Sequence, residues 1–513
     1  LGVGHNAKAH ALGYLPMLLG GIVLVFRKKY IWGFLLTALA MALEVGANHY
    51  QMTYYFMLLV LVVGAVYLVA AIQRNQLKHF SLSVGLLLVA VAIGIGMNAT
   101  SLMATKEYAD WSTRGESVLT INPDGSQKES SAGLSKEYIT QYSYGISESL
   151  NLFAPGLFGG SNSEDLGEKS NTYEYLTEQG LSRTRALEFS KGLPLYWGKQ
   201  PSVAAPAYVG AVVFFLFFLG VFLVRGYPKW WMILGALLSL MLSWGHNFSA
   251  LTNFMIDYFP LYNKFRAVSS IQVILELCVP MLGILGLAYV LNPNVGKRKK
   301  TKALLYSAAI TLGLGLLLLL FRSAFSFTGL NDATYERYFG NEIMTMIVRD
   351  REALYLNDTV RSLIFVLLAA FGLWLYLKEK IKANILVIAL GILVVVDLVG
   401  VDRRYVNEAD FVRKMQMREP FPERNVDKQI AQDTSVYRVY DASEGINGAR
   451  TSYFHKSIGG YHAAKPAAMQ DLFEFHIYEG NFEVLNMLNV KYLVQADEDG
   501  QRFGSLNQDE TGT

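Results

Sequence analysis

The chain has 513 residues, of which 52% are hydrophobic and 13% aromatic, and its formal net charge is +3 at pH 7. Its mean hydropathy of +0.27 is higher than soluble proteins of this length usually reach, so the composition indicates a membrane protein. The net charge is close to neutral for this length and gives no argument for binding nucleic acid, so no nucleic-acid partner is predicted.

Several common kinds of chemistry have no motif in this sequence. It contains no Walker loop, no Rossmann glycine fingerprint, no Gly-x-Ser-x-Gly elbow and no set of kinase motifs, so nucleotide-driven chemistry in the cytoplasm has no support. The single cysteine, Cys278, lies in an apolar segment, which excludes an internal disulfide and a zinc site made of cysteines.

Ten apolar segments are long enough, or nearly so, to cross about 30 Å of hydrocarbon. They cover residues 9–26, 30–43, 52–71, 81–97, 207–224, 230–244, 270–291, 303–321, 360–377 and 385–401. Segments this long and uniformly apolar do not suit barrel strands, because every backbone group in lipid must be satisfied internally. The sequence therefore predicts a mainly α, polytopic membrane helix bundle.

Four regions follow from this pattern. Residues 1–97 hold the first four predicted helices and 207–401 the other six, with an external loop predicted at 322–359. Residues 98–206 form a long polar insert, and residues 402–513 form a charged, soluble α/β region that we expect to be truncated. In that last region, strands are predicted at 435–440 and 490–494 and a helix at 466–478.

Short basic stretches predict the orientation in the membrane. The stretches 27–29, 74–78, 225–229, 297–302 and 378–382 alternate with acidic or polar connections. Because Lys and Arg near segment ends stay in the cytoplasm, the insert, the last region and the start of the chain are predicted to be extracytoplasmic. An outward start without signal-peptide features requires a crossing upstream, so we expect the chain to be a fragment.

One acidic residue at the predicted outer face is a candidate catalytic group. Glu44, Asn48 and Gln51 follow helical spacings of four and three, which would align them on one face. A partly buried carboxylate beside His49 could take a proton from an acceptor hydroxyl, although a polar helix cap is the alternative. Ionisable groups at membrane depth are costly and usually retained for function, so Glu44 is the predicted catalytic residue.

Three His-Asn pairs share this predicted outer face and favour hydrogen bonding to sugar hydroxyls or phosphate over three unrelated helix caps. The pairs are His5 and Asn6, Asn48 and His49, and His246 and Asn247. Their histidines could also converge with Glu44 on a divalent metal. The sequence has no tight metal spacing such as His-Glu-x-x-His, so no residue is assigned as a metal ligand and no cofactor is predicted firmly.

Two further groups could contact a lipid-linked sugar. Lys264, Arg266 and Arg114 are predicted outer cations that could bind a phosphate, with a snorkelling interfacial cation as the alternative. Trp197 and Gln200 combine an aromatic face with an amide, which suits stacking on a sugar ring, although an interfacial aromatic belt is again possible on composition. Two carboxylates within apolar helices, Glu276 and Asp397, are expected to make interhelical hydrogen bonds instead.

Several of these passages resemble YfhO-type bacterial membrane proteins. The similar passages are 4–14, 43–51, 138–145, 196–201, 263–267 and 488–493, and they span nearly the whole chain. That family is similar to the GT-C superfamily of membrane glycosyltransferases. The resemblance implies a polyprenyl-phosphate-linked sugar donor, an acceptor on an envelope glycan, teichoic acid or protein, and transfer on the outer side of the bacterial cytoplasmic membrane.

The resemblance also implies an acidic catalytic residue in the first external loop, which would lie upstream of Leu1. Glu44 would then be a second acidic residue of the site. Two other functions are weighed against a glycosyltransferase. A transporter or flippase for lipid-linked sugars predicts polar residues through the middle of the membrane. A non-catalytic envelope scaffold would use the insert and the last region for docking.

Overall fold

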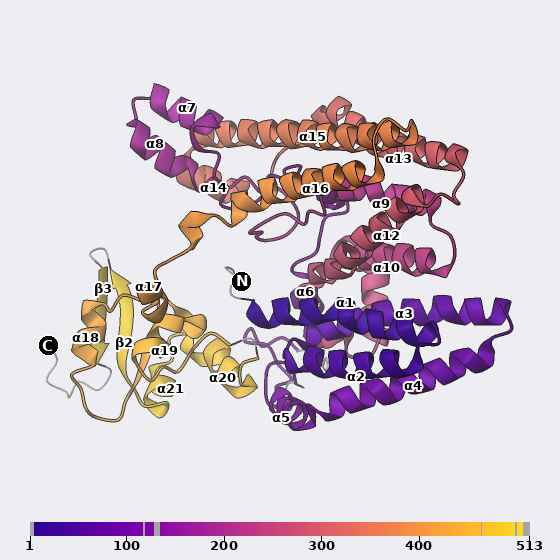
Figure 1. Ribbon diagram of the computed structural model, residues 1–513. Helices are drawn as coiled ribbons and strands as arrows, with labels where there is room; N and C mark the ends of the chain where they lie inside the picture. Colours follow the sequence, from indigo (N-terminus) through magenta and orange to yellow (C-terminus); the bar gives the residue numbers. More distant parts are fainter. Residues whose placement is uncertain (1–4, 116–117, 128–133, 463, 498–499, 506–513) are drawn as a thin grey trace, which may run out of the picture. The chain divides into compact units, whose positions relative to one another are not determined.

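The computed structural model describes residues 5–115, 118–127, 134–462, 464–497 and 500–505. The chain is mainly helical and divides into two compact units (Figure 1). Unit 1 comprises Leu1–Asn98 and Lys136–Asp410, and unit 2 comprises Ala99–Ser135 and Phe411–Thr513. The insert predicted at 98–206 is therefore not one piece, because its first part folds with the end of the chain.

Unit 1 is a helix bundle. Its helices are α1 (Asn6–Phe26), α2 (Tyr30–Gly46), α3 (Tyr50–Gln73), α4 (Leu77–Gly96), α6 (Lys136–Thr140), α7 (Asn171–Glu178), α8 (Arg183–Ser190), α9 (Ala211–Leu223), α10 (Tyr227–Ser243), α11 (Ser249–Tyr258), α12 (Val273–Leu291), α13 (Lys297–Leu320), α14 (Asp332–Phe339), α15 (Asn341–Leu377) and α16 (Ala383–Tyr405). Within the described residues, seven helices are long and apolar enough to cross a membrane, and α2 and α9 are shorter apolar helices. The number of ten crossings stays a prediction.

Glycines allow the closest helix contacts in the bundle. A Cβ atom on Gly21 of α1 would lie 2.5 Å from the hydroxyl oxygen of Thr37 on α2, and one on Gly286 of α12 would lie 2.6 Å from the backbone nitrogen of Gly220 on α9. Small residues at such crossings let backbones approach, which is how helices gain packing energy in lipid. α1 and α2 therefore pack as one pair, and α9 and α12 as another.

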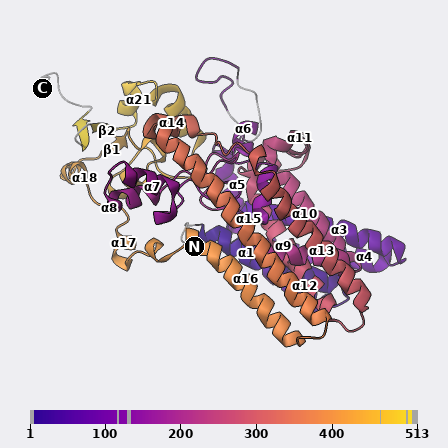
Figure 2. The same ribbon diagram turned by 90° about the horizontal axis from the view of Figure 1, so that it is seen from above.

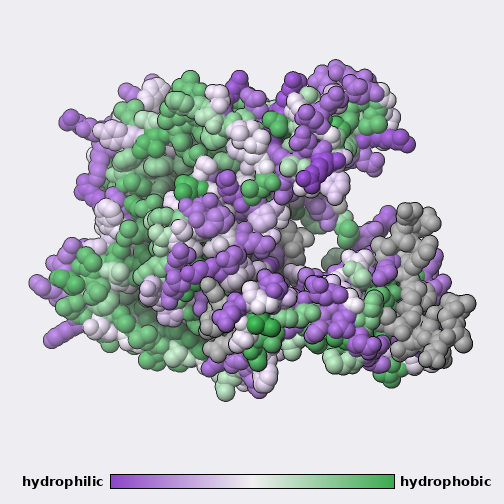
Figure 3. Space-filling view, turned by 180° about the vertical axis from the view of Figure 1, so that it is seen from behind, coloured by the Kyte–Doolittle hydropathy of each residue, from purple (hydrophilic) through white to green (hydrophobic). Residues whose placement is uncertain are grey.

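Apolar side chains on the outside of unit 1 are consistent with a surrounding membrane. Figure 3 shows extended hydrophobic patches on one face of the molecule. The exposed residues include Ile31, Trp32, Leu35 and Leu39 on α2, Leu82, Leu88 and Val89 on α4, and Ile388, Ile392, Val395 and Val396 on α16. Soluble monomers rarely expose apolar surface of this extent, so these helices suit lipid as their solvent.

The basic stretches between helices gather at one end of the bundle, as predicted. Figure 1 shows the connections α3–α4, α12–α13 and α15–α16 at the ends of the helices away from the N-terminus. Contacts between separate stretches are Arg74 over the ring of Tyr227 at 4.5 Å, Lys297 Nζ to Glu379 Oε1 at 2.8 Å, and Tyr30 OH to His79 Nδ1 at 2.8 Å. Their cytoplasmic location stays a prediction.

The predicted external loop at 322–359 is wrong in its second half, because α15 is continuous from Asn341 to Leu377 and runs alongside α16 (Figure 2). Charged residues made this stretch resemble a loop, yet Arg351 and Asp358 are buried and paired inside the protein. Arg351 pairs with Asp332 at 2.7 Å and Asp358 with Arg404 at 2.7 Å, and just beyond the stretch Arg361 pairs with Asp397 at 2.9 Å. The last pair confirms the interhelical role predicted for Asp397.

Unit 2 is a small α/β fold, as the sequence predicts. Its elements are α5 (Ala99–Asp110), α17 (Lys414–Arg418), α18 (Asn425–Ile430), α19 (Ala449–Phe454), α20 (Ala467–Leu472), α21 (Phe482–Met487), β1 (Arg438–Asp441), β2 (Val490–Asp497) and β3 (Gly500–Ser505). The sheet order is β1-β2-β3, with β1 and β2 parallel and β2 and β3 antiparallel. The sequence did not predict β3, and the predicted helix at 466–478 becomes α20 followed by a π-helical turn at Phe473–Ile477.

The segment after α5 explains why the first part of the insert belongs to unit 2. The backbone N–H of Thr113 donates to the carbonyl of Lys465 at 2.8 Å, and the N–H of Ala467 donates to the carbonyl of Trp111 at 3.0 Å. The hydroxyl of Tyr108 also donates to a backbone carbonyl, that of Ala464. Backbone pairing thus joins two pieces of chain about 350 residues apart, a separation that no local sequence pattern records.

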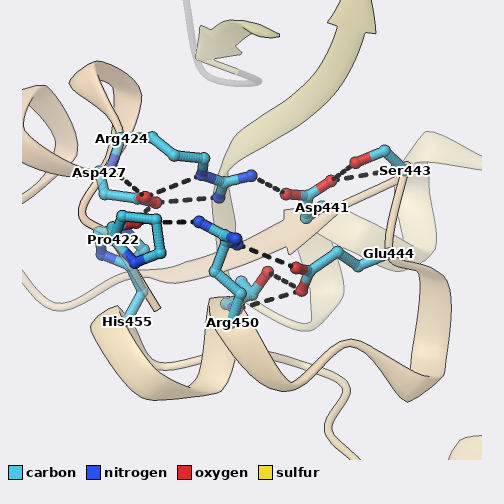
Figure 4. Close-up of polar contacts among 9 residues, drawn as sticks. Pro422, Arg424, Asp427, Asp441, Ser443, Glu444, Arg450 and His455 are labelled. Carbon is cyan, nitrogen blue, oxygen red and sulfur yellow. Dashed lines mark hydrogen bonds and ion pairs between the residues drawn. The ribbon is translucent and has the colours of Figure 1, made fainter. Parts of the chain in front are cut away.

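A buried charge network holds the first strand of unit 2 to α18 (Figure 4). The guanidinium of Arg424 donates to Asp427 at 2.8 Å and to Asp441 at 2.9 Å, and His455 Nε2 lies 3.2 Å from Asp427. Burial raises the pKa of Asp427, but the hydrogen bonds from Arg424 and His455 lower it more, so the net shift is downward. Asp427 therefore stabilises unit 2 in its ionised form.

We expect Asp427→Asn to lower the free energy of unfolding of unit 2 by about 3 kcal/mol, because one partner of a buried charge pair is lost. A lowered pKa contributes stability that is complete above the usual pKa of aspartate, so the difference from the wild type should shrink progressively as the pH falls below about 4 and through the lowered pKa. Hydrogen exchange of the β1 amides in the whole chain measures both effects. The exposed Glu423→Gln is the matched control, and equal exchange in the two variants at pH 7 would contradict the prediction.

Candidate functional site

A cavity of about 420 Å³ lies in unit 1, where the beginnings of α1 and α12 meet the segment before α9. Because both long helices end near basic stretches, the cavity lies at the opposite end of the bundle from those stretches. Its polar lining residues are Lys8, Tyr144, Gln200, Ser202, Ser269, Ser270, Gln272 and Glu276, and its apolar ones are Leu12, Val203, Ala205, Pro206, Ala207 and Val273.

Two opposite charges line this cavity. Lys8 lies in the first turn of α1, where its ammonium donates to the hydroxyl of Ser270 at 3.3 Å. Glu276 lies in the first turn of α12, and its accessible surface faces the cavity. The two charges attract each other, but no direct ion pair joins them in the described residues. The helix dipole disfavours a lysine at α1's first turn, so an anion would be stabilised there.

One wall of the cavity is formed by the segment from 196 to 208, which contains Gln200, and a buried carboxylate holds the start of this wall in place. Glu148 is fully buried and accepts hydrogen bonds from the N–H of Gly145 at 2.6 Å, the N–H of Lys199 at 3.0 Å and the hydroxyl of Tyr196 at 2.5 Å. The hydroxyl of Tyr196 in turn accepts from the N–H of Gln200 at 2.9 Å. Burial raises the pKa of Glu148, and the hydrogen bonds oppose this shift.

The far end of the same wall is held by a second carboxylate. The hydroxyl of Tyr208 donates to Asp397 at 2.7 Å, and Asp397 also pairs with Arg361. Tyr208 follows the lining residue Ala207 directly. The segment from 196 to 208 is therefore anchored at both ends, so its shape is defined by tertiary contacts although it forms no regular helix or strand.

The residue Tyr144 is positioned by the end of α10. Its N–H donates to the carbonyl of Ser243 at 2.9 Å, and its own carbonyl accepts from the side chain of Asn247 at 3.1 Å. Burial raises the pKa of Tyr144, so its hydroxyl stays protonated at neutral pH. Gln272 is held beside it by donating to the hydroxyl of Ser243 at 3.2 Å. The cavity thus offers a neutral hydroxyl and amides next to its charged groups.

Glu44 does not line the cavity, so the carboxylate that is accessible to a ligand is Glu276 instead. The predicted alignment with Asn48 and Gln51 fails because α2 ends at Gly46, and Asn48 has a left-handed φ of 58° that separates α2 from α3. Glu44 is fully buried and accepts from the hydroxyl of Thr53 at 3.1 Å. Its other oxygen has no hydrogen-bond partner among the described residues.

Trp197 is a core residue, not an open platform for a sugar ring. Its side chain is 8% exposed, and its ring packs in a tilted arrangement against Phe158, with centroids 4.3 Å apart, and edge-to-face against Phe327 at 5.3 Å. The ring therefore packs among the other aromatic side chains of the hydrophobic core of unit 1. Gln200, which was predicted together with Trp197, does line the cavity.

The predicted outer cations lie away from the cavity lining. Arg266 donates to the hydroxyl of Tyr138 at 2.5 Å and lies over its ring, while Gln51 donates to the carbonyl of Arg266 at 2.6 Å. Lys264 ends a 3-10 turn in the same segment and is not a lining residue. Arg114 belongs to unit 2 and is not a lining residue of the cavity.

The His-Asn pairs do not form one cluster. His246 and Asn247 hold the segment before Tyr144 in place, because the ring of His246 lies 3.2 Å from the carbonyl of Thr140. His49 lies close enough to Lys8 and His5 for their charges to act on it, and its burial, followed by those charges, lowers its pKa. The remaining residues, Asn6 and Asn48, are exposed near helix ends.

The metal arrangement considered from the sequence does not assemble. In the part of the chain that the structure describes, no three His, Cys, Asp or Glu side chains lie close enough together to hold a metal ion. His5, His49, His246 and Glu44 therefore do not converge there. A divalent metal has no support from these residues.

Of the two charged lining residues, Glu276 had a visible sequence signal, because it stands alone in an apolar segment where a charge is costly. The interhelical hydrogen bond predicted for Glu276 is absent among the described residues, where its side chain lines the cavity instead. Lys8 lies just before the first apolar segment, beside His5 and His10. Glu148 had no such signal, because it lies in an ordinary polar stretch of the insert. Its role depends on Lys199, which is 51 residues away in the chain.

Comparisons with protein-family models, with curated protein sequences and with solved structures find no match for this chain.

The position of Trp197 in the core leads to a prediction about stability. Trp197→Ala should lower the free energy of unfolding of the helical unit by about 3–5 kcal/mol, because it leaves a large cavity among aromatic rings. Trp197→Phe should lower the free energy of unfolding much less, since Phe keeps an aromatic contact with Phe158. Thermal unfolding in detergent compares the two variants. A stable Trp197→Ala variant that only loses binding would restore the sugar-stacking role.

Proposed function

We propose that this protein is a membrane enzyme that transfers a sugar from a polyprenyl-phosphate-linked donor to a cell-envelope acceptor on the outer side of the bacterial cytoplasmic membrane. The observation that carries the proposal is the cavity that combines Lys8, Glu276 and the amide of Gln200 at one end of the bundle. The resemblance to GT-C glycosyltransferases supplies the class of donor, and the one-sided basic stretches supply the orientation.

Each group in the cavity has a role in such a transfer. Lys8 and the starts of α1 and α12 would bind the donor phosphate, since helix N-termini favour anions. Gln200 and Gln272 would hydrogen-bond hydroxyls of the sugar. Glu276 would act as the general base toward the hydroxyl of the acceptor.

The reaction is then a single inverting displacement. The acceptor oxygen forms a bond to the anomeric carbon while the bond from that carbon to the phosphate oxygen breaks. The acceptor proton passes to Glu276, and the polyprenyl phosphate leaves with the electron pair. Lys8 would stabilise the negative charge that develops on the leaving phosphate. A fixed cation at that point lowers the activation barrier, because this charge grows in the transition state.

The position of the cavity also favours transfer over transport. A flippase needs polar groups along the whole path through the membrane. The charged lining residues lie in the first turns of α1 and α12, at one end of each helix. The sugar transporter and the non-catalytic scaffold are the alternatives that the experiment must separate.

Deleting the gene should remove one sugar from the envelope glycans, as measured by mass analysis, and the wild-type gene should restore it. Glu276→Gln should restore less than about 1% of that sugar, because general-base catalysis contributes at least about a hundredfold. Lys8→Met should also fail to restore it. The exposed Glu137→Gln, at the start of α6, is the matched control and should behave as wild type.

Two results would contradict the proposal. Full restoration by Glu276→Gln would remove this carboxylate from the mechanism. Purified protein that moves a lipid-linked sugar across vesicle membranes without any transfer would favour the transporter, and binding of envelope partners without turnover would favour the scaffold.

A further inference from the structure

We infer that Glu148 is a positioning residue that sets the shape of the sugar-binding side of the cavity. This inference rests on the proposed function for its substrate, but not for its geometry. Glu148 itself does not line the cavity. It acts through two lining residues, Tyr144 and Gln200, that come from separate parts of the chain.

The first link runs to Tyr144 through its neighbour. The N–H of Gly145 donates to Glu148 Oε2 at 2.6 Å, which fixes the backbone immediately after Tyr144. A Cβ atom on Gly145 would lie 2.7 Å from the same oxygen. The carboxylate and this backbone are therefore packed so closely that neither can shift alone.

The second link runs to Gln200. The N–H of Lys199 and the hydroxyl of Tyr196 both donate to Glu148, and the hydroxyl of Tyr196 accepts from the N–H of Gln200. A Cβ atom on Gly198 would lie 2.1 Å from Glu148 Oε1, so only glycine fits at this turn. One carboxylate thus contacts Tyr196, Gly198 and Lys199 directly and holds Gln200 through Tyr196.

The carboxyl group of Glu148 is the common acceptor of this arrangement. Its Oε2 accepts the N–H groups of Gly145 and Lys199, and its Oε1 accepts the hydroxyl of Tyr196, so a side chain without a terminal acceptor loses all three hydrogen bonds. Burying a carboxylate costs free energy, which three donors offset only in part, as the raised pKa of Glu148 indicates. A fully buried charge with this set of partners has the features of a group that preorganises a site.

Hydrogen exchange at single amides tests the geometry in the full chain. Glu148→Ala should speed exchange at Gly145, Lys199 and Gln200 by about tenfold, because the first two amides lose their acceptor and the third loses the support that Glu148 gives to the Tyr196 hydroxyl. Tyr196→Phe should speed exchange at Gln200 and leave Gly145 unchanged. Unchanged amides in Glu148→Ala, or faster exchange throughout the bundle, would overturn the inference.

Kinetics test the consequence for the substrate. The donor is the polyprenyl-phosphate sugar whose sugar is missing from the deletion strain, and bare short-chain polyprenyl phosphate is the second probe. Glu148→Ala and Gly198→Ala should raise the KM for the donor at least about tenfold with kcat within about threefold, because they weaken binding of the sugar equally in the ground and transition states. The Kd for the bare phosphate should stay within about twofold, since Lys8 is untouched.

The exposed Glu178→Ala is the matched control and should change none of these quantities. A loss of kcat with an unchanged KM would make Glu148 part of the chemistry and overturn a positioning role. Absence of transfer by the wild type would defeat the proposed function, while the amide exchange pattern would still decide whether Glu148 shapes the cavity.

Discussion

The carboxylates of Glu148, Asp358 and Asp397 lie buried in an apolar helix bundle, where water cannot satisfy them. Each is therefore held by donors from another part of the chain: Asp358 by Arg404, Asp397 by Arg361 and Tyr208, and Glu148 by backbone and tyrosine donors. Leaving such a charge unpaired costs several kcal/mol, so these contacts constrain how the segments fold together. The wall of the cavity is a product of that constraint.

The two charged residues that line the cavity are not paired in the way that these buried carboxylates are. Lys8 and Glu276 are charged residues in the first turns of apolar helices, yet they do not neutralise each other by direct contact in the described structure. Their charges are left facing an open space that is also lined by amides and hydroxyls. A space of this kind suits a ligand that is both anionic and rich in hydroxyl groups, as a phosphate-linked sugar is.

Several interpretations of local sequence patterns were wrong because tertiary contacts set where helices end and where side chains lie. Glu44, Asn48 and Gln51 have helical spacing, but a left-handed Asn48 separates α2 from α3 and sends their side chains to different places. The charged stretch before Val360 reads as a loop, but paired charges let α15 extend through it. Trp197 and Gln200 are three residues apart, and one lies in the core while the other lines the cavity.

Hydropathy and charge along the chain were sufficient to predict a helical membrane bundle, basic stretches at one end, and a small α/β fold at the end of the chain. These features depend on local composition and on the cost of burying charge, which any window of sequence records. The division of the insert between two units, the cavity and the support of its wall by Glu148 could not be read in this way. They depend on contacts such as Thr113 with Lys465 and Glu148 with Lys199, whose partners are distant in sequence and become neighbours only when the chain folds.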